Sequence, residues 1–381
     1  IAGEYNKIFF SNDCCYKGMS MRLLYCVFFL YAHILSGTEY IYPVASLNNG
    51  ATVLCIHQHN PTHIELVEWN PSTNHAEQIL WSMFNPAGLQ LLPNNAGFSF
   101  IDNGRLRIKL FQKRSPKAID FDEPLFGING LQWIDQYTCY CSAYYNNNFA
   151  LFELHDDGTM HCLCWKKGSD YLYPQKIGEQ LFYIERYIAE NSTHYRIMQC
   201  AYENNNNDAF AIVDFYSTPI IFLTMISDKH GFVLEHAQNI DSDNSIIPFS
   251  YHEIIKQGDT WSKNILFSFS IPTDLLVGDT KLYESLLPLL PRIVDNKIYF
   301  IDCAPTSPRL RRAGNDTYNL EPYFYDLSFA AHPECPEGVY RRIQKISLPE
   351  KKGHYFVPMQ CGNGFYCGGT LGATTKLLVL F

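Results

Sequence analysis

Two pairs of cysteines are spaced like metal ligands. Cys139-x-Cys141 and Cys162-x-Cys164 each place two thiols on one face of a strand, and four thiolates can hold zinc. The surrounding stretch, however, predicts four strands in series, with the third strand between the two pairs. Thiols two strand spacings apart, about 9.5 Å, exceed the ~3.8 Å between the Cβ atoms of a disulfide and the ~2.3 Å between zinc and sulfur. We therefore expect four packed thiols, with no metal and no cofactor.

Other motifs that carry chemistry are incomplete. His252-Glu253 begins like the helix of a zinc peptidase, but Lys256 stands where the second histidine ligand is required. The run 241–245 begins like a calcium-binding loop, but Ile246 stands where the loop requires glycine. Neither G-x-S-x-G nor a phosphate-binding loop is present. The motifs therefore favour a protein that is not an enzyme, without settling the question.

A third pair of cysteines lies near the end of the chain. Gly362-Asn363-Gly364 is typical of a hairpin turn, and Cys361 and Cys367 flank it. A disulfide between these two strands is geometrically allowed, and two free thiols are the alternative.

The stretch 127–165 shows how such residues would be positioned. Its strands are expected at Gly127–Ile134, Tyr137–Tyr145, Phe149–Leu154 and Thr159–Trp165, with connectors rich in Asn, Asp and Gly. Four antiparallel strands in about 40 residues match one blade of a β-propeller. Neither face of the predicted sheet is polar, which is typical of a sheet covered on both sides.

Similar strand groups follow one another along the chain. We predict an all-β fold, a β-propeller of about seven, or alternatively six, four-stranded antiparallel blades. The groups cover about 39–81, 88–121, 127–165, 170–226, 231–271 and 297–348, and three more strands occupy 355–381. Because a fourth strand is missing there, Glu39–Leu47 could complete the last blade and close the ring.

The N-terminal segment has the order of a secretory signal. Met21-Arg22 precedes an apolar run that ends at the small pair Ser36-Gly37. The run is shorter than the ~20 residues that span a bilayer, so we expect no membrane span in the mature chain. We predict an N-terminal extension with a signal segment over 1–37 and one propeller domain over 38–381. We also predict export to the periplasm or out of the cell. The alternative for the apolar run is a buried strand.

Composition restricts compartment and partners. The formal net charge is −9 and no basic stripe is present, so we expect no nucleic-acid partner. Thirteen cysteines are consistent with an oxidising compartment. Asn191-Ser192-Thr193 and Asn315-Asp316-Thr317 match the glycosylation pattern, which matters in a eukaryotic secretory pathway.

The strand pattern resembles TolB-like and WD40-like β-propellers. The stretch Tyr173–Arg186, YPQKIGEQLFYIER, is similar to the strand entries of TolB-like repeats, and the resemblance extends over residues 40–381. The Trp-Asp dipeptide of WD40 blades is absent, and Gly-His occurs once, at Gly353-His354. The resemblance implies a periplasmic scaffold that binds partner proteins, and it assigns no site residues.

We expect an exported, monomeric, non-enzymatic propeller that binds a protein or peptide at one face of the ring. The alternative is a carbohydrate-active hydrolase or lyase with carboxylates facing the channel. Loops that join the fourth strand of one blade to the first strand of the next usually gather at the channel mouth. Taking these loops as 122–126, 166–171 and 227–230 gives the candidate binding residues Asp122, Glu123, Lys166, Lys167, Lys229 and His230.

Overall fold

The structure, a computed structural model, describes the backbone of most of one compact unit, Glu39–Phe381. The described residues are 40–47, 52–60, 63–84, 87–93, 96–102, 105–111, 113, 117–121, 125–201, 209–216, 218–236, 246–272, 291–294, 296–305, 318–327, 343–346, 354–355, 359–361, 364–371 and 374–379. The predicted signal segment, Met21 to Gly37, lies outside them.

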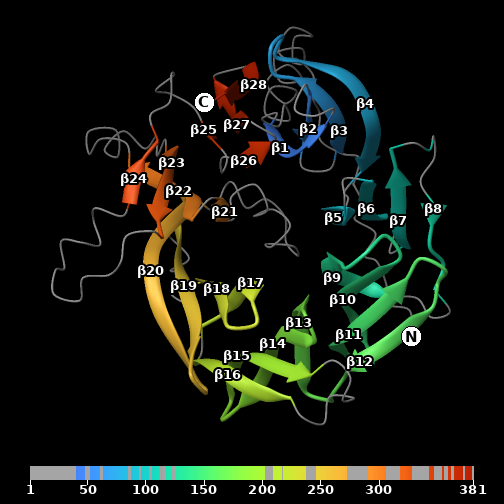
Figure 1. The fold of residues 1–381 in the computed structure, drawn as a ribbon, viewed down its shortest axis with the longest axis vertical. Coiled ribbons are helices and arrows are strands. Elements are labelled where there is room, and N and C mark those ends of the chain that lie inside the picture. The colour runs from blue at the N-terminus through green and yellow to red at the C-terminus, as the bar shows by residue number, and fades with distance from the viewer. Residues whose placement is uncertain are drawn as a thin grey trace, which may run out of the picture. The chain divides into compact units, whose positions relative to one another are not determined.

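The described residues form antiparallel strands and turns (Figure 1). None of the described elements is a helix able to cross a membrane. The first four sheets of the chain consist of β1 (Tyr40–Leu47), β2 (Thr52–Asn60), β3 (His63–Asn70) and β4 (His75–Phe84); β5 (Ala87–Leu91), β6 (Gly97–Asp102), β7 (Arg105–Leu110) and β8 (Lys117–Ala118); β9 (Phe126–Trp133), β10 (Thr138–Tyr145), β11 (Asn148–His155) and β12 (Met160–Cys164); and β13 (Ser169–Ile177), β14 (Gln180–Ala189), β15 (Ser192–Ala201) and β16 (Phe210–Tyr216).

Three more sheets follow. They consist of β17 (Ile220–Ser227), β18 (His230–His236), β19 (Ile246–Gln257) and β20 (Thr260–Pro272); β21 (Arg292–Val294), β22 (Lys297–Pro305), β23 (Tyr318–Asp326) and β24 (Ile343–Lys345); and β25 (His354–Tyr355), β26 (Met359–Cys361), β27 (Gly364–Leu371) and β28 (Thr374–Val379).

Neighbouring sheets pack face to face in chain order, and the last sheet contacts the first, so the series forms a closed ring. The first strands contact one another, with β9 between β5 and β13, and β13 next to β17. At the seam, β1 contacts β26, β27 and β28. This arrangement is the β-propeller predicted from the sequence, and each sheet is a blade.

Six blades are runs of four consecutive strands, and the seventh is irregular. β25 and β26 both pair with the edge of β27 that lies opposite β28, so they act as two pieces of one strand. The prediction that Glu39–Leu47 completes this blade is wrong, because β1 pairs with β2 inside the first sheet.

The blade β9–β12 has the predicted strands, to within a few residues at each end. Its β10–β11 turn uses Asn146 and Asn147 at φ of 46° and 70°, the left-handed conformation that favours asparagine. Both faces are buried, as the sequence indicated: Cys139 and Cys141 belong to a core shared with β5–β8, and Leu151 belongs to a core shared with β13–β16.

The strand that separates the two cysteine pairs is present. Across the blade, Cys141 pairs with Phe152 of β11, and Phe152 pairs in turn with Cys162 of β12. All four thiols of these pairs are free. Burial raises the pKa values of Cys139 and Cys141, so both remain neutral core side chains.

The strands predicted for the group 170–226 begin one strand too late. Ser169–Ile177 is itself the first strand of its blade, β13, and Ile220–Ser227 begins the next blade as β17. β13 was overlooked because Pro174 lies within it and its register shifts between Leu172 and Gln175.

Candidate functional site

The two ends of blade β9–β12 differ in chemistry. One end, formed by the β9–β10 and β11–β12 turns, carries Asp135, Asp156 and Asp157, and is called the acidic end below. The other end, formed by the start of β9, the β10–β11 turn and the segment after β12, exposes aromatic side chains and is called the aromatic end. The segment 165–168, which leads from β12 to the next blade, lies at the aromatic end.

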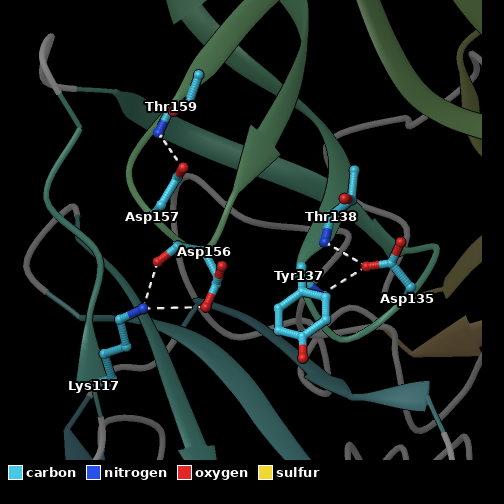
Figure 2. Close-up of polar contacts among 7 residues, drawn as sticks. All are labelled: Lys117, Asp135, Tyr137, Thr138, Asp156, Asp157 and Thr159. Atoms are coloured by element: carbon cyan, nitrogen blue, oxygen red, sulfur yellow. Dashed lines mark hydrogen bonds and ion pairs between the residues drawn. The ribbon is translucent and has the colours of Figure 1, made fainter.

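The carboxylate of Asp135 shapes the β9–β10 turn. Its Oδ1 accepts hydrogen bonds from the backbone N–H groups of Tyr137, at 2.7 Å, and Thr138, at 2.8 Å (Figure 2). A side chain that holds the backbone of a turn in this way has a structural role.

The other two carboxylates of the acidic end also have partners. Asp157 Oδ1 accepts the N–H of Thr159 at 2.9 Å, and this hydrogen bond lowers the pKa of the Asp157 carboxyl. Lys117 of β8 donates to the backbone carbonyl oxygen of Asp156 at 2.5 Å and to its Oδ2 at 3.1 Å (Figure 2). The acidic end is therefore accounted for by turn formation and one contact between blades.

The aromatic end exposes three large rings. Phe126 is 60% exposed, Tyr144 43% and Trp165 41%. Tyr144 pairs in register with Phe126, so both residues lie at the same end of the sheet. The Tyr145 ring meets Trp165 edge to face at a centroid distance of 6.4 Å, which ties the indole to the blade.

Hydrogen bonds hold the backbone beneath these rings. Asn148, which follows the β10–β11 turn, accepts the N–H of Gly168 through Oδ1 at 3.2 Å. Asp170 Oδ1 accepts the N–H of Phe149 at 2.8 Å. The segment 166–170 is thus joined to the β10–β11 turn, and the exposed surface is fixed before any ligand binds.

A salt bridge within blade β13–β16 anchors Asp170, whose other carboxylate oxygen accepts from Phe149 of blade β9–β12. Its Oδ2 lies 2.9 Å from Nε and 2.6 Å from an Nη atom of Arg186 on β14. The Arg186 side chain is 40% exposed and the Asp170 side chain is 16% exposed. One carboxylate therefore joins two blades at the aromatic end.

The predicted binding residues divide between different ends of their blades. Lys166 and Lys167 directly follow Trp165 and are exposed at the aromatic end, in a loop between blades as expected. The assignment of 227–230 to such a loop is wrong, because these residues form the β17–β18 turn within one blade. Lys229 and His230 therefore lie at the opposite end of their own blade, and Asp122 and Glu123 lie outside the described residues.

The predicted disulfide is not tested by the described side chains. In register, Cys361 lies opposite Gly364, three positions along β27 from Cys367. A disulfide between Cys361 and Cys367 would have to span this offset along the strand as well as the distance between the two strands. This disulfide stays a prediction.

Two histidine–glutamate pairs join β18 and β19. His230 Nε2 lies 2.8 Å from Glu253 Oε1, and His252 Nε2 contacts Glu235 Oε2. Burial favours a higher pKa for Glu235, but hydrogen bonds from His252 and Thr218 outweigh it and lower the pKa of this carboxyl. These side chains have each other as partners, and they stabilise the sheet.

One further carboxylate is buried within blade β9–β12. Glu153 is buried, accepts from the Tyr140 hydroxyl at 3.0 Å and lies 2.9 Å from His155 Nε2. Among the described side chains no group of three or more His, Cys, Asp or Glu is arranged to hold a metal ion.

Sequence reasoning found the lysines of the aromatic end and missed its rings. The available signal was position: Phe126 begins β9 and Trp165 directly follows β12, so both flank the loops between blades. Asp170 and Arg186 gave no signal, because they are paired by strand register and not by a motif.

Comparison with known proteins supports the fold. No protein-family model and no curated protein sequence matches this chain. A puromycin-hydrolysing peptidase of Mycobacterium tuberculosis is similar in structure, with a TM-score of 0.55 and 11% identity, over 91% of this chain and 52% of the peptidase. This chain thus spans about half of that enzyme's length.

Two similar structures match along most of both chains. An oligogalacturonate lyase of Vibrio parahaemolyticus has a TM-score of 0.53 and 8% identity, over 90% of this chain and 89% of the lyase. A TolB-like protein of Agrobacterium tumefaciens has a TM-score of 0.40 and 9% identity, over 84% and 88%. At such low identity the match to the lyase shows the fold alone.

Proposed function

We propose that this propeller binds a protein or peptide partner at the aromatic end of blade β9–β12. The observation that carries the proposal is the exposure of Phe126, Tyr144 and Trp165 at one end of one blade. Exposed groups of large apolar side chains are typical of interaction sites, and Trp and Tyr are among the residues enriched at binding hot spots.

The backbone under the rings favours binding. Asn148 and Asp170 fix the loop that carries Trp165, Lys166 and Lys167, so little conformational entropy is lost when a partner binds. The two lysines provide a polar rim beside the rings, and their aliphatic stems can cover apolar surface of the partner.

A matched pair of variants tests this function. Phe126→Ser with Trp165→Ser removes two exposed rings at the aromatic end, and Tyr137→Ser removes one ring, 56% exposed, at the acidic end. Each protein is immobilised, incubated with extract of the native host, and the bound proteins are quantified by mass spectrometry. We expect a partner retained by the wild type and Tyr137→Ser to be lost from the double variant; the same partners on all three proteins would refute the proposal.

A carbohydrate-active lyase or hydrolase is the second candidate function. The similarity to oligogalacturonate lyase along nearly the whole of both chains favours it. The test is incubation with oligogalacturonate, with and without added divalent metal, followed by detection of shortened or unsaturated products. Products would favour this second candidate, and their absence with both preparations would count against it.

We further propose that the mature protein is exported as a monomer. The support for export is the charged, apolar, small order of Met21 to Gly37. N-terminal sequencing of the protein from its native host should begin after this segment, and light scattering should give the mass of one chain. A cytosolic chain that still begins at or before Met21 would refute the export.

A further inference from the structure

The sequence Asn191-Ser192-Thr193 lies at the tip of a hairpin. β14 ends at Ala189 and β15 begins at Ser192, and these two residues are paired in register. Glu190 and Asn191 are the two turn residues, with φ of 51° and 63°. Two successive left-handed residues make the tight turn that suits a hairpin, and asparagine tolerates this conformation well.

The groups needed for N-glycosylation are accessible in this turn. Asn191 and Thr193 are both exposed. The Ser192 hydroxyl, by contrast, is engaged: it donates to the carbonyl oxygen of Ala189 at 3.1 Å and lies 2.8 Å from His194 Nε2. The middle residue thus stabilises the turn, while the asparagine and threonine of the pattern point to solvent.

An unusually exposed apolar side chain lies beside the pattern. Ile188 is 75% exposed, the highest value among the exposed large apolar side chains in the described part of the chain. It pairs in register with Thr193, and directly opposite residues on one face have Cβ atoms ~5 Å apart. A sugar attached to Asn191 would begin next to this patch, and its apolar C–H face could cover Ile188.

We propose that Asn191 is the acceptor of an N-linked glycan whose first sugar covers Ile188. In the transfer, Asn191 Nδ2 forms a bond to C1 of the first sugar of a lipid pyrophosphate-linked oligosaccharide. The bond between C1 and the phosphate oxygen breaks, the lipid pyrophosphate leaves, and the amide gives up one proton to the host transferase. This modification is independent of the binding function proposed for the aromatic end.

Variants of the three residues of the pattern test the acceptor. The chain is expressed behind a cleavable secretory leader in a eukaryotic cell, with Asn315→Gln removing the other matching sequence. We expect a mobility shift that N-glycosidase reverses, converting Asn191 to Asp in the peptide mass. Asn191→Gln and Thr193→Ala should lose the shift, while Ser192→Ala perturbs the same turn but keeps the pattern and should retain it.

The total chain in the microsomal and secreted fractions is analysed, so that poor secretion of a variant does not hide its glycan. Unmodified Asn191 in the Asn315→Gln chain from both fractions would overturn the proposal. The contact with Ile188 is tested separately by hydroxyl-radical footprinting before and after N-glycosidase. Ile188 should react more after the glycan is removed, and Ile265, which is also exposed but lies on β20, should not change; equal reactivity of Ile188 would refute the contact.

Discussion

Replacement of Asp170 tests how the aromatic end is held in place. Asp170→Ala removes the acceptor of the Phe149 N–H and the partner of Arg186. A half-buried backbone donor without a partner costs ~1–3 kcal/mol. The Arg186 side chain is 40% exposed and can turn to water, so its salt bridge adds about 1 kcal/mol or less. We therefore expect Asp170→Ala to lower the free energy of unfolding by about 1–4 kcal/mol.

Asp170→Asn is the matched control. Its amide oxygen can still accept from Phe149 N–H, and only the charge opposite Arg186 is lost, so we expect a cost of about 1 kcal/mol. Urea unfolding followed by tryptophan fluorescence gives each midpoint, and the midpoint shift multiplied by the slope gives the change in stability. Two results would refute this reasoning: Asp170→Ala within about 0.5 kcal/mol of the wild type, or two variants of equal stability.

Three further predictions concern buried groups and close contacts. Ser99→Ala should lower the free energy of unfolding by ~1–3 kcal/mol, because the buried indole N–H that donates to Ser99 Oγ at 2.7 Å loses its acceptor; an unchanged urea midpoint would contradict this. The pKa of Glu235 is lowered in the folded chain, so its stabilisation is complete above its ordinary value of 4.5 and is lost as the pH falls through the lowered pKa. Glu235→Gln should therefore be less stable than the wild type at neutral pH, and the difference should shrink in acid when unfolding is measured across that range. Gly130→Ala should lower the melting temperature more than Gly178→Ala, since both glycines have φ near 60° but only at Gly130 would a Cβ meet Tyr173 Cα, at 2.9 Å; equal effects would show that the contact does not matter.

The sequence predicted the blades best where each strand is regular. Blade β9–β12 was predicted almost strand for strand because its turns contain Asn, Asp and Gly and its strands are rich in aromatic residues. β13 escaped prediction because Tyr173 has a positive φ of 52° and the register shifts there, so the regular strand pattern is lost. One overlooked strand moved the next blade boundary and placed Lys229 and His230 at the wrong end.

The candidate site depends on register and exposure, which the sequence does not contain. Phe126 and Tyr144 are 18 positions apart and meet only because β9 and β10 pair with bulges between them. In the described part of the chain many aromatic residues lie in the core and others are exposed, so a tyrosine or tryptophan gives no sign of exposure by its type. Lys166 and Lys167 were identifiable because they directly follow a strand in a predicted loop.

The placement of β1 within the first sheet makes the ring modular. Every backbone ladder in the described residues joins strands from one continuous stretch of sequence. Among the described residues, β1 contacts β26, β27 and β28 but shares no backbone ladder with them, as expected of a junction between two blades. Gain or loss of a whole blade during evolution would therefore break no hydrogen-bonded pairing inside the remaining blades. The number of blades in a closed ring then depends on the angle between neighbouring sheets.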